Sequence, residues 1–345
     1  MALILSAGER TFAMTSRERV IAALTMKPFD RVPREMMFGF EDLLRDYPSD
    51  VAGVAYHYGK GKFQGVINAK GSWTDEWGCV WTAAEEGVKG EVKEYLLDDW
   101  SKLEHFSPPW DVLEEADLSM VDAQCESTDK FTVVFWGVSP SPFQRMQFLR
   151  GTENLFLDLA EESPEVYRLR DMVHEYFVRQ EKLWCQTKID AIHIEDDWGA
   201  QNSLLISPAL WRRFYKPLYR EYCEIAHNAG KYVIMHSDGF ILDIIDDLIE
   251  IGVDAVNSQL FCMDLEELER RFGGRICFWG EIDRQYTLPF GSEQEIRESV
   301  DRVKDVFLKD RHTGIVAQCP GGKDILHPAI RTVYDEWSKF CWEED

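Results

Sequence analysis

Five short apolar runs, separated by amphipathic segments, occupy the second half of this sequence and constrain its fold more than any other feature. The runs are rich in β-branched residues and indicate strands at 189–195, 231–236, 253–258, 275–280 and 314–319. Helix-like segments follow these runs at 207–230, 240–252, 264–273, 293–310 and 328–341. Strands that alternate with helices pair in parallel through right-handed crossovers. The second half therefore predicts a parallel α/β sheet.

The first half carries weaker signals. The runs RVPREMMF (31–38) and FTVVFWG (131–137) have the composition of strands, 152–186 has that of helices, and 44–130 is ambiguous. Two N-terminal strands, FTVVFWG and the five later runs total about eight, which favours a (β/α)8 TIM barrel with extra N-terminal helices. We expect one domain over 1–345, with 1–13 a candidate for disorder. A doubly wound open sheet is the alternative, but no GxGxxG or Walker motif in the required context supports it.

Residues at the expected helix ends agree with this division. Thr15 or Ser16 can cap a helix over the segment that follows, and Ser207 can cap the helix that Pro208 begins. Pro217 lies inside the segment 207–230, where its ring and missing N–H should kink the helix.

Composition excludes some classes of partner. The chain has 38 basic and 62 acidic residues and a formal net charge of −24, whereas binding to nucleic acid or anionic membranes needs clustered Lys and Arg. No stretch approaches the ~20 apolar residues of a membrane span. The eight cysteines show no CxxC spacing, which indicates reduced thiols and a cytoplasmic protein.

Polar residues follow the five later runs at the point where each run ends. They are Glu195, Asp196, Asp197, His236, Asp238, Asn257, Gln259, Glu281, Asp283, Gln318 and Cys319. In a TIM barrel the carboxyl ends of the strands carry the active site. We therefore expect these side chains to meet at one rim of the barrel.

The stretch YVIMHSDGF (232–240) poses the sharpest question, because an apolar run ends in His236 and Asp238. Residues i and i+2 of an extended chain point the same way, so both side chains can face one point in the barrel mouth. With Cys319 from the last strand they would form the mixed N/S/O set of a catalytic zinc site. The alternative makes His236 a hydrogen-bonded core residue, Cys319 a buried thiol and Asp238 the N-cap of the next helix.

Longer motifs resemble a known family, the uroporphyrinogen decarboxylase superfamily. They are TSRERVIAALTMKPFDRVP (15–33), IHIEDDWGAQNSLLISPALWRRFYKPLY (192–219), HSDGFILDIIDDLIEIGVDAVN (236–257) and GEIDRQYTLPFG (280–291). The resemblance covers nearly the whole chain and implies a (β/α)8 barrel. It also implies one of two chemistries: decarboxylation in the haem pathway, or zinc-dependent methyl transfer together with a corrinoid protein.

The decarboxylases of this superfamily carry an N-terminal arginine-rich signature that binds porphyrinogen carboxylates. This chain has RVPREMMFGFED there, with only Arg31 and Arg34 remaining. A substrate with many carboxylates needs a cationic cleft. The sequence therefore favours the methyltransferase branch over the decarboxylases.

The corrinoid-linked methyltransferases hold zinc with a His-x-Cys at one strand end and a distant Cys. His236 and Cys319 match the first and last of these, whereas Asp238 stands where the middle cysteine would be. The resemblance thus implies His236 and Cys319 as ligands, with Glu281 or Asp238 as the third. A carboxylate makes the metal more Lewis acidic, which suits activation of an oxygen rather than a thiol.

These features together predict a zinc-dependent methyltransferase that moves a methyl group from a methoxylated compound, expected to be an aryl methyl ether, to cobalamin on a corrinoid protein (an O-demethylase component). Glu195, Asp196 and Asp197 are candidate proton donors. The candidate substrate contacts are Trp198, Gln201, Asn257, Gln259 and Trp279. A metal-independent lyase of the decarboxylase type and a non-catalytic corrinoid- or ligand-binding barrel are the alternatives. The oligomeric state stays open, with a homodimer among the options.

Overall fold

The computed structural model describes residues 13–36, 41–56, 70–85, 90–139, 141–319 and 325–339. The prediction of disorder for 1–13 falls, apart from Ala13, outside these residues. So do the ends of the predicted strand 31–38 and of the predicted helix 328–341.

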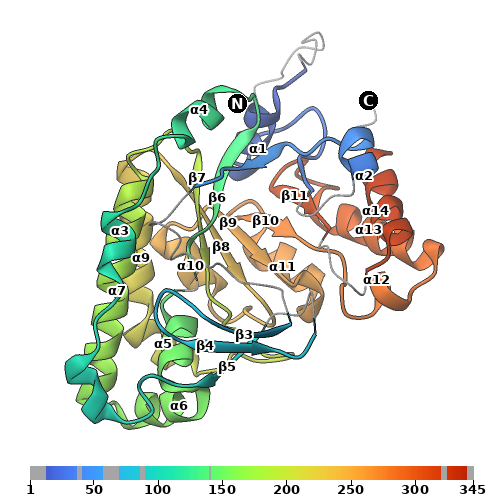
Figure 1. Cartoon of the computed structure of the whole chain (residues 1–345). Helices are drawn as coiled ribbons and strands as arrows, with labels where there is room; N and C mark the ends of the chain where they lie inside the picture. Colours follow the sequence, from blue (N-terminus) through green and yellow to red (C-terminus); the bar gives the residue numbers. More distant parts are fainter. Residues whose placement is uncertain are drawn as a thin grey trace, which may run out of the picture.

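Eight parallel strands form the central sheet and confirm the predicted TIM barrel (Figure 1). Their order around the sheet is β1, β11, β10, β9, β8, β7, β6 and β2, so each strand after β6 pairs with the strand before it in the chain. The strands are β1 (Arg34–Glu35), β2 (Val51–Gly53), β6 (Phe131–Val138), β7 (Ala191–Glu195), β8 (Tyr232–Ser237), β9 (Ala255–Ser258), β10 (Cys277–Gly280) and β11 (Ile315–Gln318).

The two edge strands β1 and β2 approach each other through polar contacts instead of a strand ladder. The amide of Asp50 donates to the carbonyl of Arg34 over 2.8 Å, and the buried Asp50 carboxylate accepts from the Arg34 amide at 3.0 Å. The guanidinium groups of Arg19 and Arg31 also bind this carboxylate, at 2.7 Å each. The barrel is closed here by a buried ion-pair network. Arg31 and Arg34, the two arginines left in the signature region, are part of this closure.

Helices surround the barrel, as the alternation in the sequence predicts. Those in the first half, which include the extra N-terminal ones, are α1 (Ser16–Leu24), α2 (Glu41–Asp46), the 3₁₀ helix η1 (Trp100–His105), α3 (Trp110–Glu114), α4 (Val121–Glu126), α5 (Phe143–Arg150), α6 (Thr152–Glu161) and α7 (Pro164–Trp184). The later ones are α8 (Pro208–Phe214), α9 (Lys216–Asn228), α10 (Ile245–Ile251), η2 (Leu260–Cys262), α11 (Leu265–Phe272), α12 (Thr287–Phe290), α13 (Glu293–Phe307) and α14 (His327–Ser338).

Three local predictions are confirmed and two helix bounds need correction. Thr15 caps α1 through a capping box with Glu18, and Ser207 caps α8. Pro217 disrupts the predicted helix 207–230 as expected, but the result is a full break at Tyr215 into α8 and α9. The predicted helix 240–252 begins only at Ile245.

The ambiguous region of the first half contains a small antiparallel sheet of β3 (Gly71–Thr74), β4 (Val80–Ala83) and β5 (Glu91–Glu94). Figure 1 shows it beside α5. The contacts that join it to that helix include Asp75, in the turn after β3, which accepts from Arg145 at 2.7 Å, and the ring of Trp81, which meets Phe148 edge-on at 4.6 Å. Such short strands, two of which are mostly exposed, leave little hydrophobic pattern for sequence reasoning to detect.

Across the described ranges, no helix combines the length and the apolar character that crossing a bilayer requires.

Candidate active site at the carboxyl ends of the barrel strands

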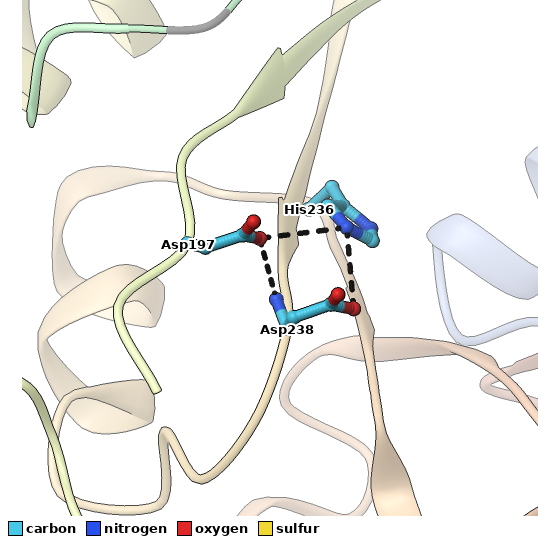
Figure 2. A group of neighbouring side chains, drawn as sticks. All are labelled: Asp197, His236 and Asp238. Atoms are coloured by element: carbon cyan, nitrogen blue, oxygen red, sulfur yellow. Dashed lines mark hydrogen bonds and ion pairs between the residues drawn. The ribbon is translucent and has the colours of Figure 1, made fainter. Parts of the chain in front are cut away.

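Three side chains from two adjacent strand ends converge at the barrel mouth (Figure 2). Asp197 follows β7, His236 lies in β8 and Asp238 follows β8. The Nε2 atom of His236 is 3.7 Å from Asp197 Oδ1 and 3.6 Å from Asp238 Oδ1. One potential ligand atom from each residue lies within 4.8 Å of the other two. The expectation that His236 and Asp238 face one point is confirmed.

Two glycine-containing loops hold Asp197 and Asp238 side by side. Gly199 and Gly239 cross so closely that a Cβ on Gly199 would lie 2.4 Å from the Gly239 carbonyl carbon and the Phe240 nitrogen. The Gly199 amide donates to the Asp238 carbonyl at 3.1 Å, and the Asp238 amide donates to Asp197 Oδ1 at 2.8 Å. Gly239 also has a φ of +75°, which favours glycine. The loops with the sequences DDWG and HSDG therefore pack against each other and hold Asp197 next to Asp238.

Asp238 does not cap a helix. The N-cap position of α10 is Ile244, without a side-chain cap, and the Asp238 carboxylate instead forms an ion pair with Arg284. The alternative reading of Asp238 as the N-cap of the next helix is therefore wrong. Sequence reasoning missed Arg284, although it stands in the motif GEIDR, three residues after Glu281.

His236 is held from behind by Asn257, whose Oδ1 lies 2.6 Å from His236 Nδ1. Burial opposes a charge on this ring, yet the carboxylates of Asp238, Glu195 and Asp197 outweigh it and raise the pKa of His236. The neighbouring His193 lies inside the barrel, its ring centre 6.0 Å from that of His236. Burial and then His236 lower the pKa of His193 to about 3, so His193 is neutral.

The three consecutive acids after β7 have different surroundings. Glu195 accepts from the Ser139 hydroxyl at 2.7 Å. Asp196 is fully buried and accepts from the amides of Phe143 and Gln144, each at 2.8 Å, at the beginning of α5. Burial raises the pKa of Asp196 well above its usual range. These contacts tie Asp196 to the first amides of α5. Asp197 Oδ2 also accepts from α5, from Gln144 Nε2 at 2.7 Å, but Asp197 Oδ1 lies beside His236.

Glu281 and Cys319, the other predicted ligands, lie near this cluster but outside the group of three. The thiol of Cys319 is buried, and burial and then Glu281 raise its pKa. Burial raises the pKa of Glu281 to about 7, against the opposing effect of Arg284, whose Nε is 3.6 Å from Glu281 Oε2. That buried oxygen has no hydrogen-bond partner among the described residues.

Of the predicted substrate contacts, Gln201 and Gln259 line a pocket beside the cluster. The pocket encloses about 410 Å³ of empty space, counted to its open mouth, and its lining also includes Phe261, Cys262, Glu281, Arg284 and Tyr286.

The other predicted contacts are packed elsewhere. Trp198 is fully buried, stacked on Phe143 at 4.3 Å, and donates through Nε1 to the Tyr219 hydroxyl at 3.0 Å. Trp279 is buried inside the barrel and donates to Glu35.

Comparison with known proteins agrees with this architecture. Residues 77–318 match the family described as uroporphyrinogen decarboxylase (URO-D). The chain belongs to this family. A solved structure described as a methyltransferase from Methanosarcina mazei superposes on the URO-D barrel with a TM-score of 0.69 and 15% identity, covering 94% of this chain and 98% of that one.

More distant matches carry no argument. They include a D-psicose 3-epimerase with D-tagatose from Clostridium cellulolyticum H10, with a TM-score of 0.38, 14% identity, and coverage of 70% of this chain and 85% of that one. A search of curated proteins finds no significant match.

Proposed function

We propose that this URO-D family member is a zinc-dependent methyltransferase. It would take a methyl group from a methoxylated compound, expected to be an aryl methyl ether, and deliver it to a corrinoid on a separate protein. The observation that carries the proposal is the convergence of Asp197, His236 and Asp238 beside a pocket at the barrel mouth. The fold shared with a methyltransferase supports it.

The three residues fit a divalent cation chemically. An imidazole nitrogen and two carboxylates are a donor set that Zn²⁺ accepts. Among the described residues, His236 Nε2 has no hydrogen-bond partner. It lies 3.6 Å from the Asp238 carboxylate and 3.7 Å from the Asp197 carboxylate. Two carboxylates brought together repel each other, and a cation between them removes that repulsion. Asp197 thus joins the proposed ligands, with Cys319 as a predicted additional one, whereas Glu281, the other ligand predicted from the sequence, is proposed below as a proton donor instead.

The donor set also suits an ether oxygen. A bound zinc ion would supply Lewis acidity, which stabilises the oxygen from which the methyl group departs. A zinc ion with oxygen ligands is a harder Lewis acid than one with thiolate ligands, and an ether oxygen is a hard base.

A proton for the leaving oxygen must come from the chain or from water. Glu281 is our candidate, because it lines the pocket, is buried, and keeps one oxygen without a hydrogen bond. A carboxyl group with a pKa of about 7 can hold a proton at neutral pH and release it during the reaction. Glu195 remains the alternative donor, whereas Asp196 is fully buried against α5.

The decarboxylase alternative finds less support. Arg31 and Arg34 would have to bind substrate carboxylates, but Arg31 holds Asp50 at 2.7 Å and Arg34 Nε donates to the Pro48 carbonyl at 3.1 Å. Both arginines are thus engaged in closing the barrel between β1 and β2.

Metal analysis and methyl transfer test the proposal together. The purified protein should contain about one zinc ion per chain, and with aryl methyl ethers it should methylate cob(I)alamin. His236→Ala should abolish both while the fold survives, whereas the control His227→Ala should leave both unchanged. His227 lies on α9, where it pairs with Asp254 at 2.9 Å. Wild-type protein without zinc, whose activity does not respond to added zinc, would contradict the proposal. Conversion of uroporphyrinogen would favour the decarboxylase alternative.

A further inference from the structure

A series of hydrogen-bonded, buried polar side chains crosses the interior of the barrel behind His236. The residues lie on neighbouring strands: in the ladder His236 stands opposite Asn257, and Glu35 opposite Gln318. His236 Nδ1 lies 2.6 Å from Asn257 Oδ1, and Asn257 Nδ2 donates to Gln318 Oε1 at 2.7 Å. Gln318 Nε2 then donates to Glu35 Oε2 at 2.9 Å. Four side chains from β8, β9, β11 and β1 are thus joined.

A backbone carbonyl fixes the direction of the hydrogen bonds in this series. Asn257 Nδ2 also donates to the backbone carbonyl of Trp279 at 2.6 Å, and a carbonyl oxygen only accepts. A flipped Asn257 amide would place its oxygen against both the Trp279 carbonyl and Gln318 Oε1. The carboxylate of Glu35, which also accepts from Trp279 Nε1, holds Gln318 in the matching orientation. Asn257 Oδ1 therefore faces His236 as an acceptor.

We infer that Asn257 is a positioning residue, which holds the His236 proton on Nδ1 and leaves the Nε2 lone pair directed at Asp197 and Asp238. An acceptor at 2.6 Å requires a hydrogen on Nδ1, so neutral His236 has its free lone pair on Nε2. This is the nitrogen that lies 3.6–3.7 Å from the two carboxylates.

The same contacts argue against Asn257 as a substrate contact. Asn257 is buried, both of its N–H groups are donated, to Trp279 and Gln318, and its oxygen meets His236. An amide with its hydrogens already used has no donor for a ligand in the pocket. Asn257 is also not among the residues that line the pocket. Its role, on this inference, is exerted through His236.

The tautomer itself can be measured in the wild-type protein, without metal and without activity. Long-range ¹H–¹⁵N correlation spectra of ¹⁵N-histidine-labelled protein distinguish Nδ1–H from Nε2–H in each neutral ring, and the signals missing in His236→Gln identify His236. We expect Nδ1–H. A neutral His236 with its proton on Nε2 would overturn the inference, whatever any variant does.

One variant at position 257 and one control extend the test. Asn257→Leu removes the acceptor and should shift His236 to Nε2–H. Ser258→Ala is the matched control, because Ser258 is buried on the same strand and its hydroxyl has no hydrogen bond among the described residues. A wild-type tautomer in Asn257→Leu would also overturn the inference.

Zinc affinity gives a second readout, and this part rests on the proposed function. Asn257→Leu should weaken zinc binding about 10–100-fold, the range for groups that orient a metal-binding histidine, while Ser258→Ala stays within a few-fold of wild type. If wild-type protein binds no zinc, the proposed function fails, but the tautomer still decides the inference. Unchanged zinc affinity in Asn257→Leu would contradict the positioning role.

Discussion

Replacing Asp238 by alanine should separate metal binding from stability at this site. The Asp238 carboxylate does not cap α10, the next helix, and it belongs to the group whose potential ligand atoms lie within 4.8 Å of one another. The change therefore removes a proposed zinc ligand and an ion pair with Arg284, but no helix cap.

The two effects differ in size. The Asp238 side chain is 36% exposed, and ion pairs at such positions stabilise a protein by about 0.2–1 kcal/mol. Loss of Asp238 also relieves its repulsion with Asp197, so the free energy of unfolding without metal should change by less than about 1 kcal/mol. Zinc affinity should fall by at least the ~10–100-fold reported for supporting groups, which is about 1.4–2.7 kcal/mol of binding free energy.

A true cap provides the control. Asp264 is the N-cap of α11 and accepts from the Glu267 amide at 2.7 Å. Asp264→Ala should lower the free energy of unfolding by about 0.5–2 kcal/mol and leave zinc affinity unchanged, the reverse of the pattern for Asp238→Ala.

The assays are urea unfolding of metal-free protein and competition for zinc with a chromophoric chelator. Asp238→Ala with wild-type zinc affinity would refute the assignment of Asp238 as a ligand. Asp238→Cys is a useful companion, because it keeps a metal ligand but makes the metal a weaker Lewis acid toward oxygen. We expect this variant to retain zinc and to cleave ethers more slowly.

Other parts of the structure lead to further predictions. Gly199→Ala should lower the free energy of unfolding by about 1–3 kcal/mol or more and weaken zinc binding, because its Cβ would meet backbone atoms at 2.4 Å. The control Gly230→Ala has open space around it but a φ of +72°, so it should lower the free energy of unfolding by about 1–2 kcal/mol and leave zinc affinity unchanged. Trp198→Ala should cost about 3–5 kcal/mol in urea unfolding without changing the KM of the folded enzyme, since Trp198 packs on Phe143 and is fully buried. Burial raises the pKa of Glu336, but hydrogen bonds from flanking basic side chains outweigh it and lower the pKa to about 2. The stabilisation that Glu336 provides is therefore complete above its ordinary pKa of 4.5 and is lost as the pH falls toward 2, and the stability difference from Glu336→Gln should shrink over that window.

The barrel could be predicted because its signals are local. The runs 189–195, 231–236 and 314–319 are apolar and β-branched because their strands are buried on both faces, and the helices between them begin at recognisable caps such as Ser207. Where the strands are mostly exposed, as in β3 and β5, the hydrophobic pattern did not reveal them.

In the candidate site, too, only the features that depend on local sequence could be predicted. The nearness of His236 and Asp238 follows from the period of an extended chain, so two residues of YVIMHSDGF were enough to predict it. The same period puts the side chains of Asp196 and Asp197 on opposite faces, but it does not say which of the two reaches the barrel mouth. The structure decides this, because Asp196 accepts from the first amides of α5, whereas Asp197 Oδ1 lies beside His236.

Sequence alone determined the strand count, the barrel and the rim at which polar residues gather, because periodicity and strand order require only local information. Tertiary structure alone decided which polar residues from different strands meet. Arg284 pairs with Asp238 across 46 positions, and Asn257 meets both His236 and Gln318. Contacts of this kind depend on strand register and on the close crossing of two glycine loops, and a shift of one residue in a parallel ladder would turn each side chain to the opposite face.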